Sequence, residues 1–171
     1  MLLFIVLYYC LSYVIIMEKT NVMRVLQQKK IQYKEYFYWD KNTSNWLDIA
    51  KVMDEDENMV FKTLVTVSKS KQYYVFMIPV SKELNLKKCA SVVNEKNVEM
   101  IPQKELLPLT WYVHWWCSPI WMKKNFKVII DSSAQNYESI IFSWWKIWYQ
   151  VEVSLSDLSK VINCQFWDVV N

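Results

Sequence analysis

The chain has 171 residues, a formal net charge of +3 and 22% charged residues, which fits one domain with a real core and excludes a disordered tail or a collagen-like repeat. It contains no glycine and ten tryptophans, although roughly 12 glycines are expected at the usual share. Its four cysteines form no CxxC pair, so the sequence signals neither a disulfide framework nor a zinc knuckle, and we expect no metal and no other cofactor.

Residues 1–16 carry no charge and are nearly all apolar. A run of this length only just reaches the lower limit for spanning a bilayer, and it lacks the basic start and the small-residue cleavage site of a signal peptide. We interpret 1–16 as an over-extended start before Met17, and the alternative is a membrane anchor. The functional domain is expected to span 17–171.

From residue 17 onward the hydrophobic periodicity predicts both helices and strands, with no linker or repeat between them. Helices are predicted at about 20–30, 45–53, 84–94 and 155–163, and strands at about 31–38, 59–68, 72–80, 97–101, 126–131, 137–142 and 149–154. Because most strands follow one another with few helices between them, we expect a mixed α/β (α+β) fold. Its sheet should be curved or barrel-like, mixed and largely antiparallel, with helices around it.

Most of the tryptophans stand in polar or turn-like segments. Trp46 follows Thr-Ser-Asn, and Trp144 and Trp145 lie between two predicted strands, where a hairpin requires residues that tolerate positive φ. Our hypothesis is that most or all ten positions are glycines in the functional protein, because the source translates UGA as glycine or because glycines were deliberately replaced. The alternative is an aromatic-rich binding surface.

Lys62 is the most notable titratable residue, since it interrupts an apolar predicted strand. In a pocket its cation could bind a phosphate or carbonyl oxygen, whereas on a wet face it is only a solvated lysine. His114 and Cys117 form an isolated HxxC, which has too few ligands for zinc and no third group to orient a nucleophilic pair. Conventional side-chain catalysis is therefore poorly supported.

Two segments change character if tryptophan is replaced by glycine. Trp115-Trp116-Cys117-Ser118-Pro119 becomes Gly-Gly-Cys-Ser-Pro, in which backbone N–H groups could approach a carbonyl or phosphate oxygen closely. The segment from Ser143 to Trp148 could present a hydroxyl and amides in the same way. The alternative is that both segments are merely tight turns.

At these residues the chain resembles the YbaK family of bacterial aminoacyl-tRNA deacylases, which is related to the editing domain of prolyl-tRNA synthetase. The resemblance extends over essentially all of 17–169, and eight of the ten tryptophans fall where the family has glycine. The segments that carry it are Phe61–Val65, Leu84–Lys88, Val98–Met100, Trp111–Lys124, Ser143–Trp148 and Asp157–Val161.

The resemblance implies a cytoplasmic, trans-editing hydrolase that cleaves the ester between a wrong amino acid and the 3′ end of tRNA, above all cysteine on tRNA for proline. It implies that Lys62 is catalytic by holding the terminal phosphate or substrate near the ester. Substrate-binding roles are implied for Tyr36, Trp115, Trp116, Ser118 and Ser143. The substrate's own thiol would attack the ester, which fits the missing catalytic base.

The partner implied by the resemblance is the acceptor end of mischarged tRNA, with prolyl-tRNA synthetase as an open second partner and no membrane. Asn45 and Gln150 depart from the family pattern, which leaves the amino-acid specificity open and keeps alanine as an alternative to cysteine. The other interpretations are a non-catalytic tRNA- or synthetase-binding module of the same fold and a membrane-anchored aromatic-surface protein. With tryptophan at 115 and 116, we expect the printed chain to be inactive or misfolded.

Overall fold

The computed structural model describes residues 20–38, 46–114, 116–144 and 149–171. The apolar segment 1–16 lies outside these residues, so its interpretation as an over-extended start stays a prediction. No helix within the described ranges is long and apolar enough to cross a membrane.

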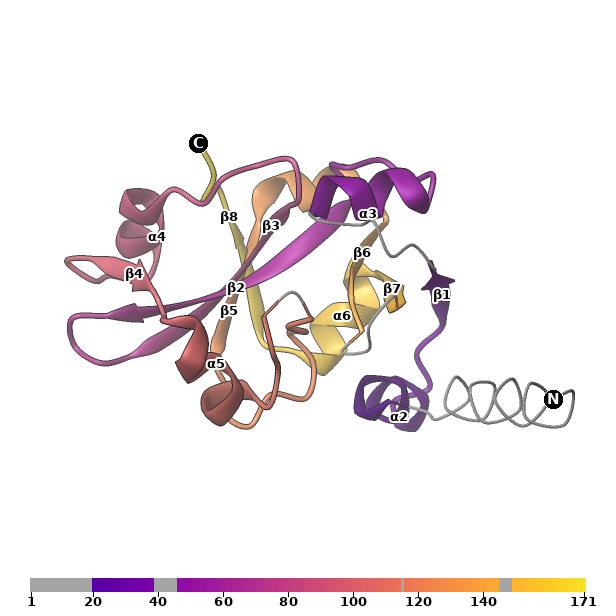
Figure 1. The fold of residues 1–171 in the computed structure, drawn as a ribbon, viewed down its shortest axis with the longest axis horizontal. Helices are drawn as coiled ribbons and strands as arrows, with labels where there is room; N and C mark the ends of the chain where they lie inside the picture. The colour runs from indigo at the N-terminus through magenta and orange to yellow at the C-terminus, as the bar shows by residue number, and fades with distance from the viewer. Residues whose placement is uncertain (1–19, 39–45, 115, 145–148) are drawn as a thin grey trace, which may run out of the picture.

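Short helices separate most of the described strands along the chain, and only β2–β3 and β6–β7 follow one another directly within the described residues (Figure 1). The helices are α2 (Asn21–Gln28), α3 (Trp46–Val52), α4 (Leu86–Val92), α5 (Gln103–Thr110), the 3₁₀ helix η1 (Ser132–Asn136) and α6 (Leu155–Val161). The strands are β1 (Tyr33–Phe37), β2 (Val60–Ser68), β3 (Tyr73–Pro79), β4 (Val98–Met100), β5 (Lys127–Asp131), β6 (Ser139–Ser143), β7 (Tyr149–Ser154) and β8 (Cys164–Trp167).

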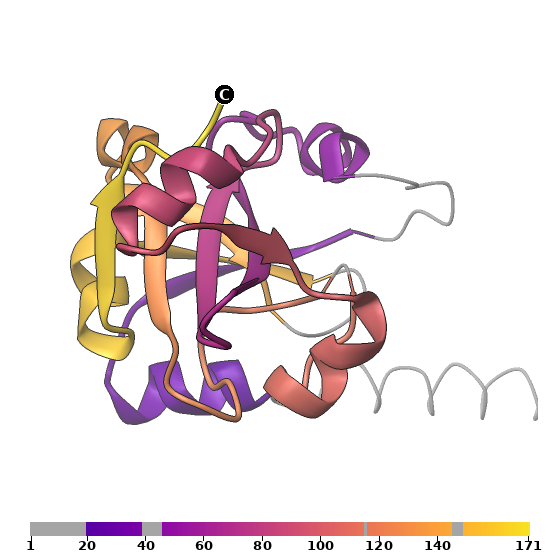
Figure 2. The same cartoon turned by 90° about the vertical axis from the view of Figure 1, so that its left-hand side faces the viewer.

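The strands form one eight-stranded mixed sheet in the order β1-β7-β6-β2-β3-β5-β8, with β4 paired to β2 beside this path. Among the described strands, β2 pairs in parallel with β6, β3 with β5, and β5 with β8, and the other four pairings are antiparallel. Figure 2 shows β1, β6 and β7 running across the direction of β3, β5 and β8, so the sheet curves strongly. The expected mixed, curved sheet is confirmed.

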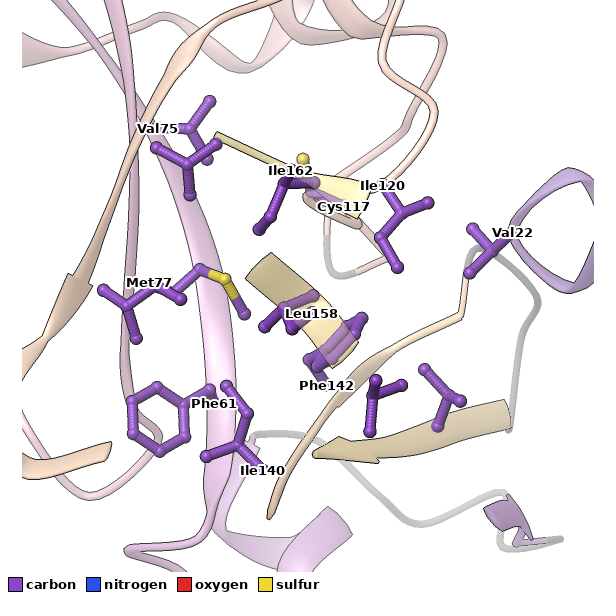
Figure 3. Packing of buried hydrophobic residues seen from close by; sticks show 14 of the residues in the cluster. Val22, Phe61, Val75, Met77, Cys117, Ile120, Ile140, Phe142, Leu158 and Ile162 are labelled. Carbon is purple, nitrogen blue, oxygen red and sulfur yellow. The ribbon is translucent and has the colours of Figure 1, made fainter. Parts of the chain in front are cut away.

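The sheet is covered on both faces. The main core lies between one face and helices α2, α5 and α6, and α5 contributes Leu106 to it. Figure 3 shows Val22 of α2 and Leu158 of α6 in the same cluster as the sheet residues Phe61 and Phe142. The other face carries two smaller clusters, to which α4 contributes Cys89 and Ala90 and α3 contributes Ala50. Strand alternation therefore sends successive side chains of β2 and β6 into different cores.

Local signals explain why two of the covering helices begin where they do. The Thr20 side chain accepts a hydrogen bond of 3.3 Å from the Met23 backbone N–H at the start of α2. The Ser154 hydroxyl accepts one of 3.2 Å from Asp157 N at the start of α6, as serine at the N-cap of a helix typically does. Sequence periodicity missed α5, η1 and β8.

Candidate functional site

Four polar side chains form a row across neighbouring strands of the sheet. Tyr36 on β1 pairs with Gln150 on β7, and Gln150 pairs with Ser143 on β6. The last registered pair of the parallel strands β2 and β6 directly precedes Lys62 and Ser143, so these two residues lie side by side. Cross-strand neighbours share a face of the sheet, and the structure therefore brings together three of the predicted site residues, Lys62, Ser143 and Tyr36.

The row faces away from the main core. Phe61 and Phe142, which immediately precede Lys62 and Ser143, point into that core, so alternation directs the row to the opposite face. There it borders the small cluster of Ala50, Val60, Val80 and Ile141, against which Tyr36 also packs. Helix α3 contributes Ala50 to this cluster and so covers the face beside the row.

Lys62 is a half-buried cation at the β2 position of the row. Its Nζ donates a hydrogen bond of 3.3 Å to the backbone oxygen of Val80. Burial lowers the pKa of Lys62, and the negative charge of Glu83 opposes this shift. One backbone carbonyl leaves the ammonium with further donor capacity, so Lys62 is suited to bind an anion that reaches this face.

The centre of the row contains buried polar atoms that lack partners. Ser143 is 1% exposed and Gln150 is 0% exposed, and the Ser143 hydroxyl and both amide atoms of Gln150 form no hydrogen bond within the described part of the chain. Burial raises the pKa of Tyr38, and a weaker interaction between its hydroxyl and the Gln150 side chain lowers it, although the two groups do not meet hydrogen-bond geometry. Unpaired buried groups of this kind cost about 1–3 kcal/mol each, so they mark a place where a polar ligand would gain hydrogen bonds.

Tyr36 occupies the outer end of the row as a hydrogen-bond donor. Its hydroxyl donates to Glu152 Oε2 at 2.7 Å and accepts from Lys34 Nζ at 2.6 Å. Burial, together with the carboxylates of Glu55 and Glu152, raises the pKa of Tyr36. The phenol therefore stays protonated at neutral pH and can donate a hydrogen bond but cannot act as a base.

Part of the predicted glycine-like loop packs with the main core, to which Cys117 and Ile120 belong. Trp115 lies outside the described residues. Trp116 is half-buried, and Ser118 is fully buried, where its hydroxyl accepts a hydrogen bond of 3.4 Å from Ile120 N. Cys117 between them belongs to the main core, so the substrate-binding roles of Trp116 and Ser118 stay predictions.

His114 and Cys117 differ in their surroundings. His114 is exposed, whereas Cys117 is 4% exposed in the main core, and burial raises the pKa of the Cys117 thiol. A buried thiol with a raised pKa is a poor nucleophile. Among the described residues, no group of three histidine, cysteine or acidic side chains could hold a metal ion.

The described tryptophans do not all behave alike. Trp111 and Trp121 have φ angles of 71° and 62°, in the left-handed region that favours glycine, and their rings pack in a tilted pair with centroids 4.6 Å apart. Trp144, in contrast, is fully buried, and its indole N–H donates to the Thr20 hydroxyl. The backbone thus supports the glycine hypothesis at 111 and 121, while Trp144 packs as an aromatic residue. Four further positions lie outside the described residues, namely Trp39, Trp115, Trp145 and Trp148.

Comparison with known proteins places this chain in a family. The family model of the aminoacyl-tRNA editing domain matches residues 40–161, and the chain belongs to this family. A protein of Enterococcus faecalis named "Putative Cys-tRNA(Pro)/Cys-tRNA(Cys) deacylase EbsC" is 38% identical over 153 residues, which cover 89% of this chain and 93% of that protein. The predicted resemblance is confirmed.

Solved structures share the fold at low sequence identity. A hypothetical protein of known structure superposes with a TM-score of 0.80 at 18% identity, covering 89% of this chain and 100% of that one. A structure described as a "putative trans-editing enzyme for prolyl tRNA synthetase" superposes with a TM-score of 0.75 at 14% identity, covering 90% and 99%. The mixed sheet with its helices is therefore an established arrangement.

Proposed function

We propose that the protein is a trans-editing hydrolase that deacylates mischarged tRNA, with Cys-tRNA(Pro) as its substrate. Family membership and the name of the Enterococcus faecalis relative support the reaction class and the substrate. The observation that carries the proposal is the row itself. Lys62 lies beside Ser143, Ser143 pairs with Gln150, and the Ser143 hydroxyl and Gln150 amide have no hydrogen-bond partner among the described residues.

The row offers complementary groups for the end of an aminoacyl-tRNA. Lys62 would bind the terminal phosphate, since its ammonium is partly desolvated and hydrogen-bonded to one backbone oxygen. The Ser143 hydroxyl and Gln150 amide would pair with the ribose hydroxyls or the amino group of the substrate, which would satisfy atoms that are otherwise unpaired. The same two groups would select among aminoacyl substrates, because a substrate that leaves a buried amide without a hydrogen bond binds less tightly.

The row contains no histidine and no carboxylate that would serve as a general base, which favours a nucleophile supplied by the substrate. The thiol sulfur of the cysteinyl group forms a bond to its own ester carbonyl carbon, and the ester C–O bond breaks. The 3′ oxygen of the tRNA leaves with the proton that the thiol gives up. Water then opens the cyclic thioester that remains, adding its hydroxyl to the carbonyl carbon and returning a proton to sulfur, so that free cysteine is released. The protein would contribute by fixing the ester and the thiol in reactive geometry and by stabilising the charge that develops on oxygen.

The mischarged tRNA acceptor end is the expected partner, with prolyl-tRNA synthetase as a second partner that would select the tRNA. Both occur in the cytoplasm, where we expect the protein to act. Backbone amides near Trp115 and Trp116 and the side chain of Ser118 would line the carbonyl side of the substrate if the loop carries glycine at 115 and 116.

The test is a deacylation assay on Cys-tRNA(Pro) with two parent chains. One is the printed sequence, and the other starts at Met17 and carries glycine at the eight tryptophan positions where the family has glycine. We expect activity in the glycine-restored chain and none in the printed chain, because indoles at 115 and 116 would fill the substrate site.

Variants of the glycine-restored chain then test the row. Lys62→Ala should lower the rate by about 10²-fold or more, the usual loss when a charge-stabilising donor is removed. Lys69→Ala, which removes an exposed lysine from the β2–β3 turn, should leave it unchanged. Ser-tRNA(Pro), which lacks the thiol, should resist cleavage. Ala-tRNA(Pro) tests the alternative that the protein removes alanine instead of cysteine. Equal rates for Lys62→Ala and its parent would refute the proposal.

A further inference from the structure

A groove of about 740 Å³ lies at the end of the sheet where β5 begins. It is lined by α2, by the loop that precedes β5, and by the connection between α6 and β8. Figure 2 shows α2 and the loop before β5 along the same edge of the molecule. None of the four residues of the Lys62 row lines it, so it is a separate feature of the surface.

The charge of the groove has a single sign. Lys124 and Lys127 line it, and no acidic side chain does. Both lysines are exposed, and neither forms an ion pair within the described ranges. Asp157 on the adjacent helix α6 is already paired with Lys160 at 2.6 Å. An anionic partner would therefore meet two available ammonium groups and no repelling carboxylate in the lining.

The uncharged lining suits a nucleic-acid strand. Asn125, Asn163 and Gln165 provide carboxamides, which commonly donate hydrogen bonds to phosphate and sugar oxygens. Phe126 adds a half-buried aromatic ring, a surface on which a base can stack. Cations, amides and an aromatic ring in one groove fit a polynucleotide backbone better than they fit an apolar ligand.

The position of the groove relative to Lys62 determines which part of a tRNA could reach it. Lys62 pairs with Ile78 on β3, and extending the β3–β5 register brings Asp131 to the same level. Lys127 lies four residues and two strand spacings from Lys62, which corresponds to about 16 Å along the sheet. Phosphates of a stacked strand repeat every ~3.4 Å along its axis, so this separation spans about four to five nucleotides.

We infer that the groove binds the phosphate backbone of the tRNA acceptor end, where the unpaired 3′ terminus joins the double-stranded stem. The inference rests on the proposed function, since it assumes that the terminal ester lies at the Lys62 row. It adds a second contact, in which Lys124 and Lys127 neutralise phosphates. This contact does not depend on the nucleotide sequence. The groove thus supplies general affinity for acceptor stems, while the row acts on the ester.

Binding of a fluorescent acceptor-stem minihelix with an unpaired CCA end tests the groove without any need for catalysis. The glycine-restored parent is compared with three double variants. These are Lys124→Ala/Lys127→Ala, the charge-preserving Lys124→Arg/Lys127→Arg, and the control Lys69→Ala/Lys96→Ala, which removes two exposed lysines elsewhere. Fluorescence anisotropy gives the dissociation constant at several salt concentrations. The alanine pair should weaken binding roughly tenfold and reduce the slope of log K against log salt by about two, whereas the arginine pair and the control should bind like the parent.

The possible results separate this inference from the proposed function. If the alanine pair and the parent bind equally tightly with the same salt slope, the groove inference is wrong, whether or not the protein cleaves the ester. If the alanine pair weakens binding but the glycine-restored parent cleaves no aminoacyl-tRNA, the groove inference holds and the proposed function is wrong. Equal weakening by the control pair would also refute the groove, because the effect would then come from net charge alone.

Discussion

Trp111 and Trp121 allow a direct test of whether glycine belongs at their positions. Each is replaced by glycine and, separately, by alanine, so that both variants lose the indole and the ring stacking cancels from the comparison. The left-handed backbone, with φ of 71° and 62°, costs an L-residue about 1–2 kcal/mol. Glycine avoids this cost but loses about 0.5–1 kcal/mol through its greater freedom in the unfolded chain. The glycine variant should therefore be more stable than the alanine variant by about 0.5–1 kcal/mol at each site.

Urea unfolding measures this difference as a shift in midpoint at a constant m-value, and it corresponds to about 1–4 °C in melting temperature for a chain of this size. Trp167 is the matched control, because it is 51% exposed in the extended strand β8. There the order should reverse, with alanine more stable than glycine. Alanine variants that equal or exceed the glycine variants at both 111 and 121 would refute the argument from backbone conformation.

Three further predictions concern the buried polar and titratable groups. Gln150→Met should raise the free energy of unfolding by about 1 kcal/mol, since it removes a buried amide that has no partner among the described residues, while slowing deacylation in the glycine-restored chain. A less stable variant would show that the amide forms a stabilising hydrogen bond. Burial lowers the pKa of Lys62 in the folded chain, so Lys62 loses its proton at a lower pH than an exposed lysine does. The rate of Lys62-dependent cleavage, corrected for spontaneous hydrolysis, should fall as pH rises through this lowered pKa. Glu83→Gln should move this fall to lower pH, and Lys62→Arg should abolish it. The cost of burying the Lys62 charge destabilises the fold fully below the folded-state pKa, shrinks as pH rises through that pKa, and is gone above the pKa of the unfolded chain. Burial raises the pKa of Cys89 to about 12 and also raises that of Cys117. Both thiols should therefore resist iodoacetamide at pH 8 until urea unfolds the chain. Rapid labelling of either cysteine in the native protein, detected by mass spectrometry, would contradict this prediction.

Much of the fold could be predicted because its strands alternate or carry continuous apolar runs. The missed elements have weak local signals. Pro108 lies inside α5, and proline ordinarily argues against a helix interior. The four residues of β8 alternate between half-buried and exposed positions, and their pairing with β5 is not visible in local periodicity.

The residues of the site could be predicted from the sequence, but their alignment in one row could not. Lys62, Ser143 and Tyr36 could be selected from the family resemblance, but their alignment depends on the parallel β2–β6 register and on the β6–β7 and β1–β7 registers. Gln150 was seen only as a departure from the family pattern. Its place opposite Ser143 follows from hairpin register, which a segment without recognisable turn residues does not specify.

The side-by-side placement of Lys62 and Ser143 has a consequence for folding. The two residues are about eighty positions apart in sequence, and contacts of such separation form slowly because the intervening chain must first be closed into a loop. Gln150 joins the row from a strand close to the C-terminus. A chain still emerging from the ribosome would therefore lack the assembled row until nearly all of it had been synthesised, so a nascent or truncated chain should show no deacylase activity.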